Sequence, residues 1–293
     1  MGLIASKKPA PQPVKLKEQE YSWSSRVLGR GELSTVYFAT ALASGKQVAI
    51  KRIAPKQLNS KTHGRLVKEA ALLHDISESP EVTQKFAKLV EGFIDHEGGL
   101  NIVMDHVNGG DLFDLMRKRP KGFSEQRAKN YIKQLLKSLH FLHNHDIAHL
   151  DLKLENIMYD KDNKRLKIID FGFATKTSKI NPDTGIKEKI LLNTFCGSLN
   201  YTPPEIIKKV KFDGKQADIW SLGVVCFILL TGKFPFDAYH PNEVYKSIVQ
   251  GSFVFPEHLS PGAKSFLNCM LDIYPDNRSN VTSLLKHSWL NDC

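Results

Sequence analysis

The chain has 293 residues, enough for one large domain or two closely packed lobes, and its 41% hydrophobic and 25% charged content is ordinary for a soluble globular protein. The net charge of +10 comes from Lys and Arg residues that are scattered along the sequence, which disfavours nucleic-acid binding and favours a solvated basic surface. The longest apolar run, residues 222–230, is too short to span a bilayer, and residues 1–20 lack the apolar stretch of a secretory signal. The four cysteines show no metal-like spacing, so we expect free thiols and a cytoplasmic location.

The N-terminal segment, residues 1–20, is polar and basic, contains three prolines and is predicted to be a flexible tail. Its first six residues, MGLIAS, fit the N-myristoylation pattern with Gly2 as the acceptor, and Lys7 and Lys8 would add an electrostatic contact with a membrane. The alternative is an unstructured start that fits a short pattern by chance. A single acyl chain would give only weak membrane association.

Residues 21–106 are predicted to form a small, strand-rich lobe. Runs of β-branched and aromatic residues between glycines predict strands near residues 27–28, 36–39, 47–51, 88–94 and 100–105. Apolar residues at helical spacing predict one helix over residues 65–74.

Residues 107–293 are predicted to form a larger, helical lobe. Ser124 is a suitable N-cap, and apolar residues repeat at helical spacing after it. Helices are expected over residues 128–143, 217–231 and 262–271. The sequence therefore predicts an α+β protein of two lobes.

Two short segments carry the strongest chemical signal. HLDLKLEN occupies residues 149–156 and DFG begins at Asp170. Asp151 would orient a hydroxyl group and accept its proton, and Lys153 would neutralise charge on a moving phosphoryl group. Asn156 and Asp170 would supply oxygen ligands for Mg²⁺. A lone acidic residue is usually a surface charge, but the ordered set indicates phosphoryl transfer.

A glycine-rich segment and a lysine upstream indicate a nucleotide site. GRGELSTV begins at Gly29 between two predicted strands, where backbone amides could approach phosphate groups. A hairpin turn would explain these glycines alone, but Lys51 in a VAIK strand favours ATP.

These motifs, in this order, resemble those of the eukaryotic serine/threonine protein kinases over nearly the whole chain, and particularly the calcium/calmodulin-dependent-like group. The resemblance implies the bilobal protein kinase fold and transfer of the γ-phosphate of ATP, with Mg²⁺, to Ser or Thr hydroxyls of protein substrates. It implies that Glu69 pairs with Lys51 as part of the catalytic set. It also implies a nucleotide site formed by Leu28, Gly29, Gly31, Ser34, Val36, Ala49, Lys51, Met104, Asp105, Val107, Asp111 and Met158.

The sequence departs from the kinase pattern at Leu150, where most members have an Arg that binds the activation-loop phosphate. The HLD sequence at residues 149–151 is similar to that of myosin light-chain kinases, which do not depend on such a phosphate. The LNTFCGS sequence resembles the phosphorylated loop of AMP-activated-kinase-related enzymes, with Thr194 at the phosphosite. Our hypothesis is that Thr194 is phosphorylated and that activity depends on it only weakly.

The segment that precedes Glu205 is longer than usual. Its insert at residues 176–189 contains NPDTG and predicts a mobile loop. Asp111 and Glu155 favour substrates with an Arg on the N-terminal side of the target residue. Because the sequence ends three residues after Leu290, no calmodulin-binding tail is expected.

Three structural contacts follow from the same resemblance. Glu205 is expected to pair with Arg278. His149 is expected to stack with Phe171 and Leu73, and its segment is expected to be tied to Asp218, so that this histidine is structural rather than a base.

Two rival functions remain open. A pseudokinase that binds nucleotide or partners without catalysis is favoured by Leu150 and Ser34, and is opposed by the complete catalytic set. A small-molecule kinase is opposed by the PPE sequence that ends at Glu205.

Overall fold

The computed structural model describes residues 20–31, 33–58, 64, 72, 81–193 and 198–291. The chain divides into a smaller unit, residues 1–64 and 89–106, and a larger unit, residues 65–88 and 107–293. The predicted lobes differ from these units because residues 65–88 group with the larger one. The predicted tail and the predicted helix over residues 65–74 fall outside the described residues, except for Glu20 and Leu72.

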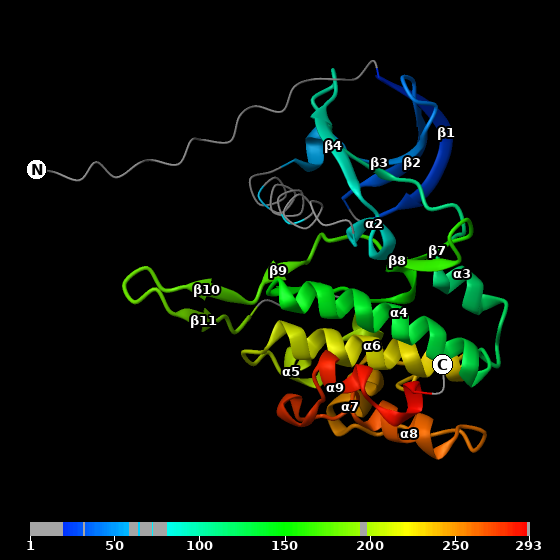
Figure 1. Cartoon of the computed structure of the whole chain (residues 1–293), viewed down its shortest axis with the longest axis vertical. Coiled ribbons are helices and arrows are strands. Elements are labelled where there is room, and N and C mark those ends of the chain that lie inside the picture. The colour runs from blue at the N-terminus through cyan, green and yellow to red at the C-terminus, as the bar shows by residue number, and fades with distance from the viewer. Residues whose placement is uncertain are drawn as a thin grey trace, which may run out of the picture. The chain divides into compact units, whose positions relative to one another are not determined.

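The smaller unit contains one antiparallel sheet in the order β1-β2-β3-β5-β4 (Figure 1). The strands are β1 (Tyr21–Arg30), β2 (Thr35–Ala41), β3 (Gln47–Ile53), β4 (Leu89–Ile94) and β5 (Leu100–Asp105), with a 3-10 turn η2 (Pro55–Gln57) after β3. One face of the sheet forms an apolar core that includes Ala39, Val48, Ile50, Phe93 and Val103. Side chains alternate between the two faces of a strand, so the neighbours of these residues lie on the other face.

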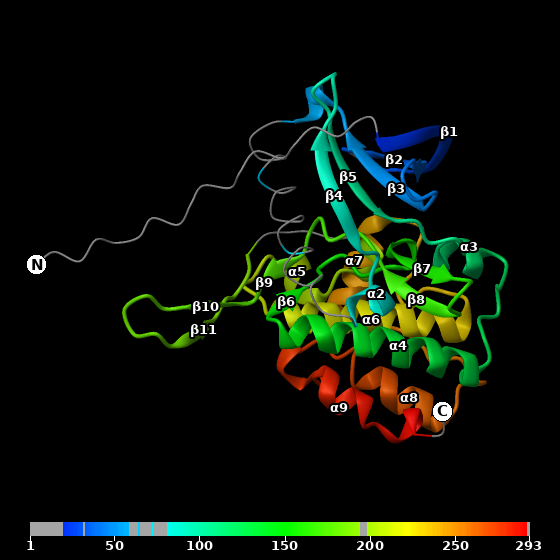
Figure 2. The same cartoon turned by 45° about the horizontal axis from the view of Figure 1, so that its top comes forward.

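The larger unit is mainly helical (Figure 2). Its helices are α2 (Val82–Lys85), α3 (Leu112–Arg117), α4 (Glu125–Asn144), α5 (Pro204–Ile207), α6 (Gly214–Thr231), α7 (Pro241–Gln250), α8 (Pro261–Asn268) and α9 (Val281–Leu285). Its strands are β6 (Ile147–Ala148), β7 (Ile157–Asp160), β8 (Arg165–Ile168), β9 (Thr175–Lys176), β10 (Ser178–Ile180) and β11 (Lys187–Lys189). Short 3-10 turns are η3 (Leu154–Asn156), η4 (Leu199–Tyr201), η5 (Pro275–Asn277) and η6 (Ser288–Leu290).

Two long helices, α4 and α6, pack together inside the larger unit. Ser124 stands at the N-cap of α4, as predicted, although its side chain makes no capping hydrogen bond. Helix α6 begins at Gly214, three residues before the predicted start. It is long and apolar enough to cross a membrane, but 89% of it is buried inside the protein, which is the environment of a core helix.

The prediction of a loop over residues 176–189 is wrong, because residues 178–189 form a β-hairpin (Figure 1). Strands β10 and β11 pair antiparallel, with Ser178 opposite Lys189. The Asn181 side chain holds the turn by accepting a hydrogen bond from the Asp183 N–H at 2.9 Å. Gly185 closes the turn at a φ of +68°, a left-handed conformation that favours glycine.

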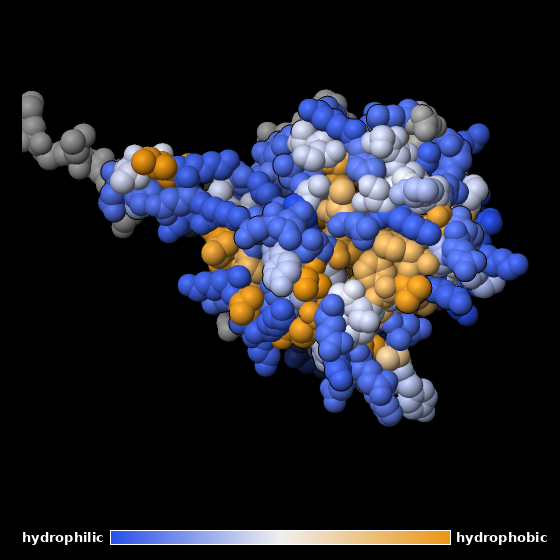
Figure 3. Space-filling model, turned by 90° about the horizontal axis from the view of Figure 1, so that it is seen from below, coloured by the Kyte–Doolittle hydropathy of each residue, from blue (hydrophilic) through white to orange (hydrophobic). Residues whose placement is uncertain are grey.

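The hairpin exposes apolar side chains near its tip. Ile180 and Ile186 are 62% and 64% exposed. Figure 3 shows apolar surface on the arm at the left, which corresponds to the hairpin in Figure 1. The rest of the arm is hydrophilic, and it includes the exposed residues Lys179, Lys187 and Lys189.

Candidate active site

The segment that carries the predicted catalytic residues follows β6 and is held by α6. Asp218, fully buried in α6, accepts hydrogen bonds at 2.8 Å from the backbone N–H groups of both His149 and Leu150. The His143 ring lies 3.0 Å from the same carboxylate. Leu150 adopts a left-handed φ of +63°, which is uncommon for a residue other than glycine. The Asp218 carboxylate therefore fixes a loop conformation that the chain would rarely adopt unaided.

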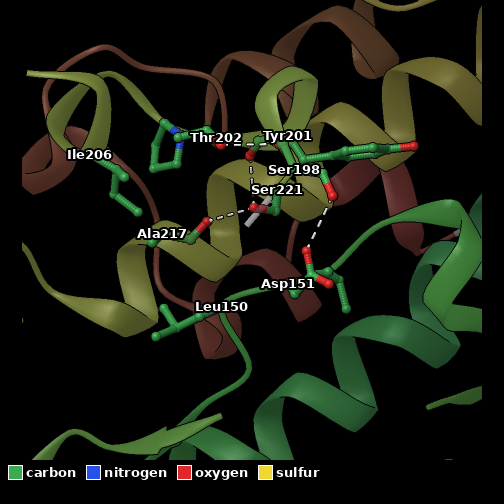
Figure 4. Close-up of a pocket in the computed structure, with 10 residues that line it drawn as sticks. Leu150, Asp151, Ser198, Tyr201, Thr202, Ile206, Ala217 and Ser221 are labelled. Carbon is green, nitrogen blue, oxygen red and sulfur yellow. Dashed lines mark hydrogen bonds between the residues drawn. The ribbon is translucent and has the colours of Figure 1, made fainter. Parts of the chain in front are cut away.

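Asp151 lies at the centre of a polar cluster in this loop. The Lys153 ammonium lies 2.7 Å from Asp151 Oδ2 and donates to the Ser198 hydroxyl at 2.9 Å. Ser198 in turn donates to Asp151 Oδ1 at 3.4 Å (Figure 4). The Asn156 side-chain amide donates to the Asp151 backbone carbonyl at 2.8 Å and to Oδ2 at 2.9 Å. These contacts fix the direction of a carboxylate that is only 6% exposed.

The hairpin of β7 and β8 places the two predicted metal ligands at one end. Ile157 lies opposite Ile168, and the N–H of Ile169 donates to the Asn156 backbone carbonyl at 2.9 Å, so Asp170 follows directly. The Asn156 amide nitrogen already donates both hydrogen bonds described above, which leaves the amide oxygen for a cation. Amide and carboxylate oxygens suit Mg²⁺, which usually takes few protein ligands and completes its shell with phosphate oxygens and water. This donor set fits Mg²⁺, and the described residues hold no cluster of three His, Cys, Asp or Glu side chains typical of a metal site held by protein alone.

His149 is fully buried and packs against Phe171, with 5.2 Å between the ring centroids. Its Nδ1 accepts a hydrogen bond from the Asp151 N–H at 3.4 Å. The predicted stacking on Phe171 and the tie of this segment to Asp218 are confirmed. The third predicted member, Leu73, lies outside the described residues.

The segment after Ser198 is held against α6 beside the catalytic cluster (Figure 4). The Thr202 hydroxyl donates to the Ser198 carbonyl at 3.0 Å, and the Ser221 hydroxyl of α6 donates to the Tyr201 carbonyl at 2.9 Å. Burial and the neighbouring Glu155 carboxylate raise the pKa of Tyr201, so its phenol stays neutral. Here Leu150, Asp151, Tyr201 and Ile206 line a small hollow (Figure 4).

The predicted ion pair between Glu205 and Arg278 is confirmed. Arg278 donates to both carboxylate oxygens of Glu205 at 2.7 Å, and both side chains are buried. Arg278 also donates to the Asp272 carbonyl and lies 5.0 Å from the centroid of the Trp220 ring. A bidentate pair with further donors satisfied is the arrangement that a buried ion pair requires.

Leu150, at the position where most kinases have an arginine, makes apolar contacts. Leu150 and Leu192 pack against a buried cluster of Ile206, Phe212 and Ala217. Leu192 and Phe212 exchange two backbone hydrogen bonds of 2.8 and 2.9 Å. The segment that follows the β-hairpin is therefore held to the catalytic loop by apolar packing.

Three ion pairs lie at this attachment. Lys187 and Lys215 lie 2.5 and 3.0 Å from the Asp146 carboxylate, and Lys189 lies 2.7 Å from Asp213. Partial burial of Asp146 acts to raise its pKa, but hydrogen bonds from the two lysines prevail and lower the pKa to about 2. Lys187 and Lys189 both belong to β11, so the hairpin is attached through this strand.

In the smaller unit, four predicted nucleotide residues share one sheet face. Val36 lies opposite Lys51, and Ala49 lies opposite Met104. Ala49 and Lys51 are two positions apart on β3, so both point to the same face. This face is opposite to the one that carries the apolar core.

The glycine-rich segment forms the turn between β1 and β2. Gly29 pairs with Val36, and the N–H of Gly31 donates to the Ser34 carbonyl at 2.8 Å. A Cβ atom added at Gly29 would meet no atom within 4 Å, so the backbone is open there. Leu28 is partly exposed on β1, and Asp105 ends β5.

The remaining predicted nucleotide residues, Val107, Asp111 and Met158, lie in the larger unit. Val107 is buried, while Asp111 forms a β-bridge with Met158 and caps α3 by accepting from the Asp114 N–H at 2.7 Å. Glu69, Thr194 and Gly2 lie outside the described residues. The pairing of Glu69 with Lys51, the phosphorylation of Thr194 and the acylation of Gly2 stay predictions.

A model of the protein kinase domain family matches residues 23–290. The chain is 32% identical over 265 residues to the CBL-interacting serine/threonine-protein kinase 13 of Arabidopsis thaliana, an alignment that covers 90% of this chain and 50% of the plant protein. The chain thus spans about half the length of the curated relative that it matches. The chain belongs to the protein kinase domain family.

The predicted fold class, an α+β protein with the bilobal protein kinase fold, is confirmed by this match and by the strand-rich and helical units. The match and the relative also support the prediction of a protein serine/threonine kinase, a class that uses ATP and Mg²⁺.

Ser198 is a member of the polar cluster around Asp151 that the sequence did not reveal. Its partners Lys153 and Asp151 lie 45 and 47 positions away, so no short motif joins them.

Proposed function

We propose that the chain is an active kinase that transfers the γ-phosphate of ATP to Ser or Thr hydroxyls of protein substrates. The arrangement of Asp151 carries this proposal, because Lys153, Asn156 and Ser198 all contact its carboxylate and hold it in one direction. In this loop Asp151 orients the substrate hydroxyl and accepts its proton. Lys153 neutralises charge on the transferred group, since its ammonium already reaches the same carboxylate.

The nucleotide would be contacted by the residues that share one face of the sheet in the smaller unit, Val36, Ala49, Lys51 and Met104. The open backbone at Gly29 would allow phosphate oxygens to approach. In the larger unit, the Asn156 amide oxygen and the Asp170 carboxylate would hold Mg²⁺. When bound, this ion neutralises phosphate charge and fixes the phosphate geometry.

The test is transfer of labelled γ-phosphate from Mg-ATP to a mixed panel of Ser, Thr and Tyr peptides. We expect transfer to Ser and Thr peptides, and a loss of roughly 10²–10⁴-fold in Asp151→Asn, which keeps the size of the side chain and removes the base. Binding of Mg-ATP without any transfer would contradict the proposal and favour the pseudokinase. Lys129→Gln, a change on α4 outside the catalytic loop, is the control and should transfer phosphate at the rate of the unaltered chain.

We infer, at a finer level, that the chain belongs to the calcium/calmodulin-dependent-like group and that Thr194 is phosphorylated without being essential. The support is that Leu150 and Leu192 pack against the same buried cluster, so that apolar packing connects the catalytic loop with the segment that leads to Thr194. Thr194→Ala should therefore keep at least about a third of the activity of the unaltered chain, and Thr194→Glu should have an activity similar to that of Thr194→Ala. Near-complete loss in Thr194→Ala that Thr194→Glu restores would contradict this.

We propose that substrates carry an Arg on the N-terminal side of the target residue, with Glu155 and Asp111 as its carboxylate partners. Glu155 lies beside the Tyr201 phenol next to the catalytic loop, and it is exposed. Replacing this Arg by Ala in a peptide substrate should lower its phosphorylation by the unaltered chain, and should lower it less for the Glu155→Gln variant.

We also propose a cytoplasmic location, with weak membrane association if Gly2 is acylated. Mass spectrometry of the N-terminal peptide would detect the acyl group.

A further inference from the structure

A second hollow in the larger unit has a strongly basic lining. It has a volume of about 440 Å³ and lies between α4 and the hairpin of β7 and β8. Four of its eight lining side chains are cations and none is an acid. The cations are Arg127, Lys133 and Lys137 of α4 and Lys164 of the turn between the strands. We call this site the basic hollow.

The spacing of residues along α4 builds one wall of the basic hollow. Arg127, Tyr131, Gln134 and Lys137 are three or four positions apart, so they lie along one face of the helix. Gln134 accepts a hydrogen bond from the Leu166 N–H of β8 at 2.9 Å. That bond holds the strand hairpin beside the helix and sets the width of the hollow.

The turn between β7 and β8 brings the fourth cation. The Asp160 carboxylate accepts from the N–H groups of Asp162 and Asn163, each at 3.1 Å, and fixes the shape of the turn. Lys164 follows at a left-handed φ of +52°. Its place at the rim of the hollow is therefore set by the turn rather than left to a flexible segment.

Arg127 is held in place by neutral groups. Its Nε and Nη2 donate to the Tyr131 hydroxyl at 3.1 and 2.9 Å. The guanidinium lies 4.8 Å from the centroid of the Phe123 ring and 5.5 Å from that of Tyr131. Ring faces and a phenol orient the group without cancelling its charge.

None of the four cations is paired with a carboxylate in the part of the chain that the structure describes. The acids of the adjacent turn have other partners. Asp160 accepts from Asn163 at 2.9 Å and lies 3.4 Å from Lys167, and Asp162 accepts from Asn108 at 2.7 Å. The hollow is therefore a region of positive potential lined by oriented donors.

We propose that the basic hollow binds a compact polyanion that carries several phosphate groups, of the inositol polyphosphate type, either free or as the headgroup of a phosphoinositide. The volume is that of a small-ligand site. Arginine and lysine are the usual partners of phosphate oxygens, and the lining tyrosine hydroxyls and side-chain amides add neutral donors. Nothing in the kinase reaction uses these residues.

The test is calorimetric titration of the whole chain with inositol hexakisphosphate at fixed ionic strength. We expect saturable binding at one site, and an affinity at least about tenfold weaker in the double variant Lys137→Gln, Lys164→Gln. The matched control, Lys208→Gln with Lys211→Gln, removes two exposed charges elsewhere in the larger unit and should change the affinity by less than about twofold. Lys137→Arg, which keeps the charge, should bind like the unaltered chain.

A second titration separates the two sources of this chemistry. Vesicles that contain phosphatidylinositol bisphosphate are compared with vesicles of phosphatidylcholine, with and without competing inositol hexakisphosphate. Sedimentation of the chain with the phosphoinositide vesicles, lost in the Lys137→Gln, Lys164→Gln variant, assigns the site to a lipid headgroup, whereas binding of the soluble probe alone assigns it to a free ligand. Equal weakening in the hollow and control variants, or no saturable binding to either probe, would overturn the proposal.

Discussion

Single side chains fix the geometry of the catalytic loop from a distance. Asp218 touches none of the proposed reacting groups, yet its carboxylate receives two backbone N–H groups of that loop. Glu205 and Arg278 act in the same way on the segment that follows Ser198, through a pair that is shielded from water. These buried charges are stable only because each finds its partners.

Asp218→Asn tests the first of these side chains. The amide has one accepting oxygen, so one of the two backbone N–H groups would face an NH₂ donor. We expect a loss of about 2–3 kcal/mol in the free energy of unfolding, measured by urea denaturation, together with lower phosphate transfer. Asp213→Asn removes a carboxylate whose partner Lys189 is exposed, and should cost less than about 1 kcal/mol. Equal effects of the two changes would show that the Asp218 contacts do not hold the loop.

The pair of Glu205 and Arg278 is tested by a double-mutant cycle. Glu205→Gln or Arg278→Met alone leaves one buried charge without its partner and should destabilise the chain by about 3–5 kcal/mol. Both changes together should cost clearly less than the sum of the single changes, as denaturant unfolding would measure. Simple additivity would contradict the coupling that the two 2.7 Å contacts indicate.

At the scale of elements, the β10–β11 hairpin is attached to the larger unit by three kinds of contact. Two lysines of β11 reach Asp146 and Asp213, the Thr177 N–H donates to the Asp146 carbonyl at 2.8 Å, and the residues after β11 pack through Leu192. This attachment connects the hairpin with the apolar cluster on which Leu150 of the catalytic loop also packs.

The pH dependence of this attachment follows from Asp146. Its pKa is lowered to about 2 from a usual value of 3.8, so the stabilisation is complete above about pH 4 and is lost as pH falls toward 2. The urea midpoint of the unaltered chain should therefore fall across this window. In Asp146→Asn the fall should be smaller, since one of the titrating groups is gone. Parallel curves for the two chains would argue against the lysine contacts.

The apolar part of the attachment is tested with neighbouring leucines. Leu192→Ala removes side-chain contacts with the cluster of Ile206, Phe212 and Ala217, and we expect about 1–2 kcal/mol of lost stability because Leu192 is only half-buried. Activity should then depend more strongly on phosphorylation of Thr194. Leu191→Ala changes a side chain that is 51% exposed and should leave both stability and this dependence unaltered.

At the scale of the whole molecule, the sequence predicted the five strands of the smaller unit, the helices α4, α6 and α8, and the polar core of the catalytic loop. Asp151, Lys153 and Asn156 lie within six positions, so their spacing alone predicted a shared site. Contacts between segments that are distant in the sequence were harder to predict. The fold brings Ser198 into the polar cluster from 47 positions away. The packing of Leu150 and Leu192 against one apolar cluster could not be predicted, because the sequence showed only that Leu150 replaces the usual arginine.

The hairpin was missed for a different reason. The NPDTG sequence indicates a turn, but each flanking strand has only three residues. Three residues are too few to show the alternation of apolar and polar side chains by which strands are recognised. Pairing within the hairpin and the attachment of β11 to two aspartates supply the order that the local pattern lacks.

The tip of this hairpin offers a place where the chain can be lengthened. Its turn is exposed at Pro182, Asp183 and Thr184, and all the contacts that attach the hairpin lie at or beyond the strands. The entropic cost of closing a surface loop grows only slowly as residues are added to it. A peptide tag or a fluorescent reporter inserted there would project into solvent on two paired strands, leading directly into the segment that bears Thr194.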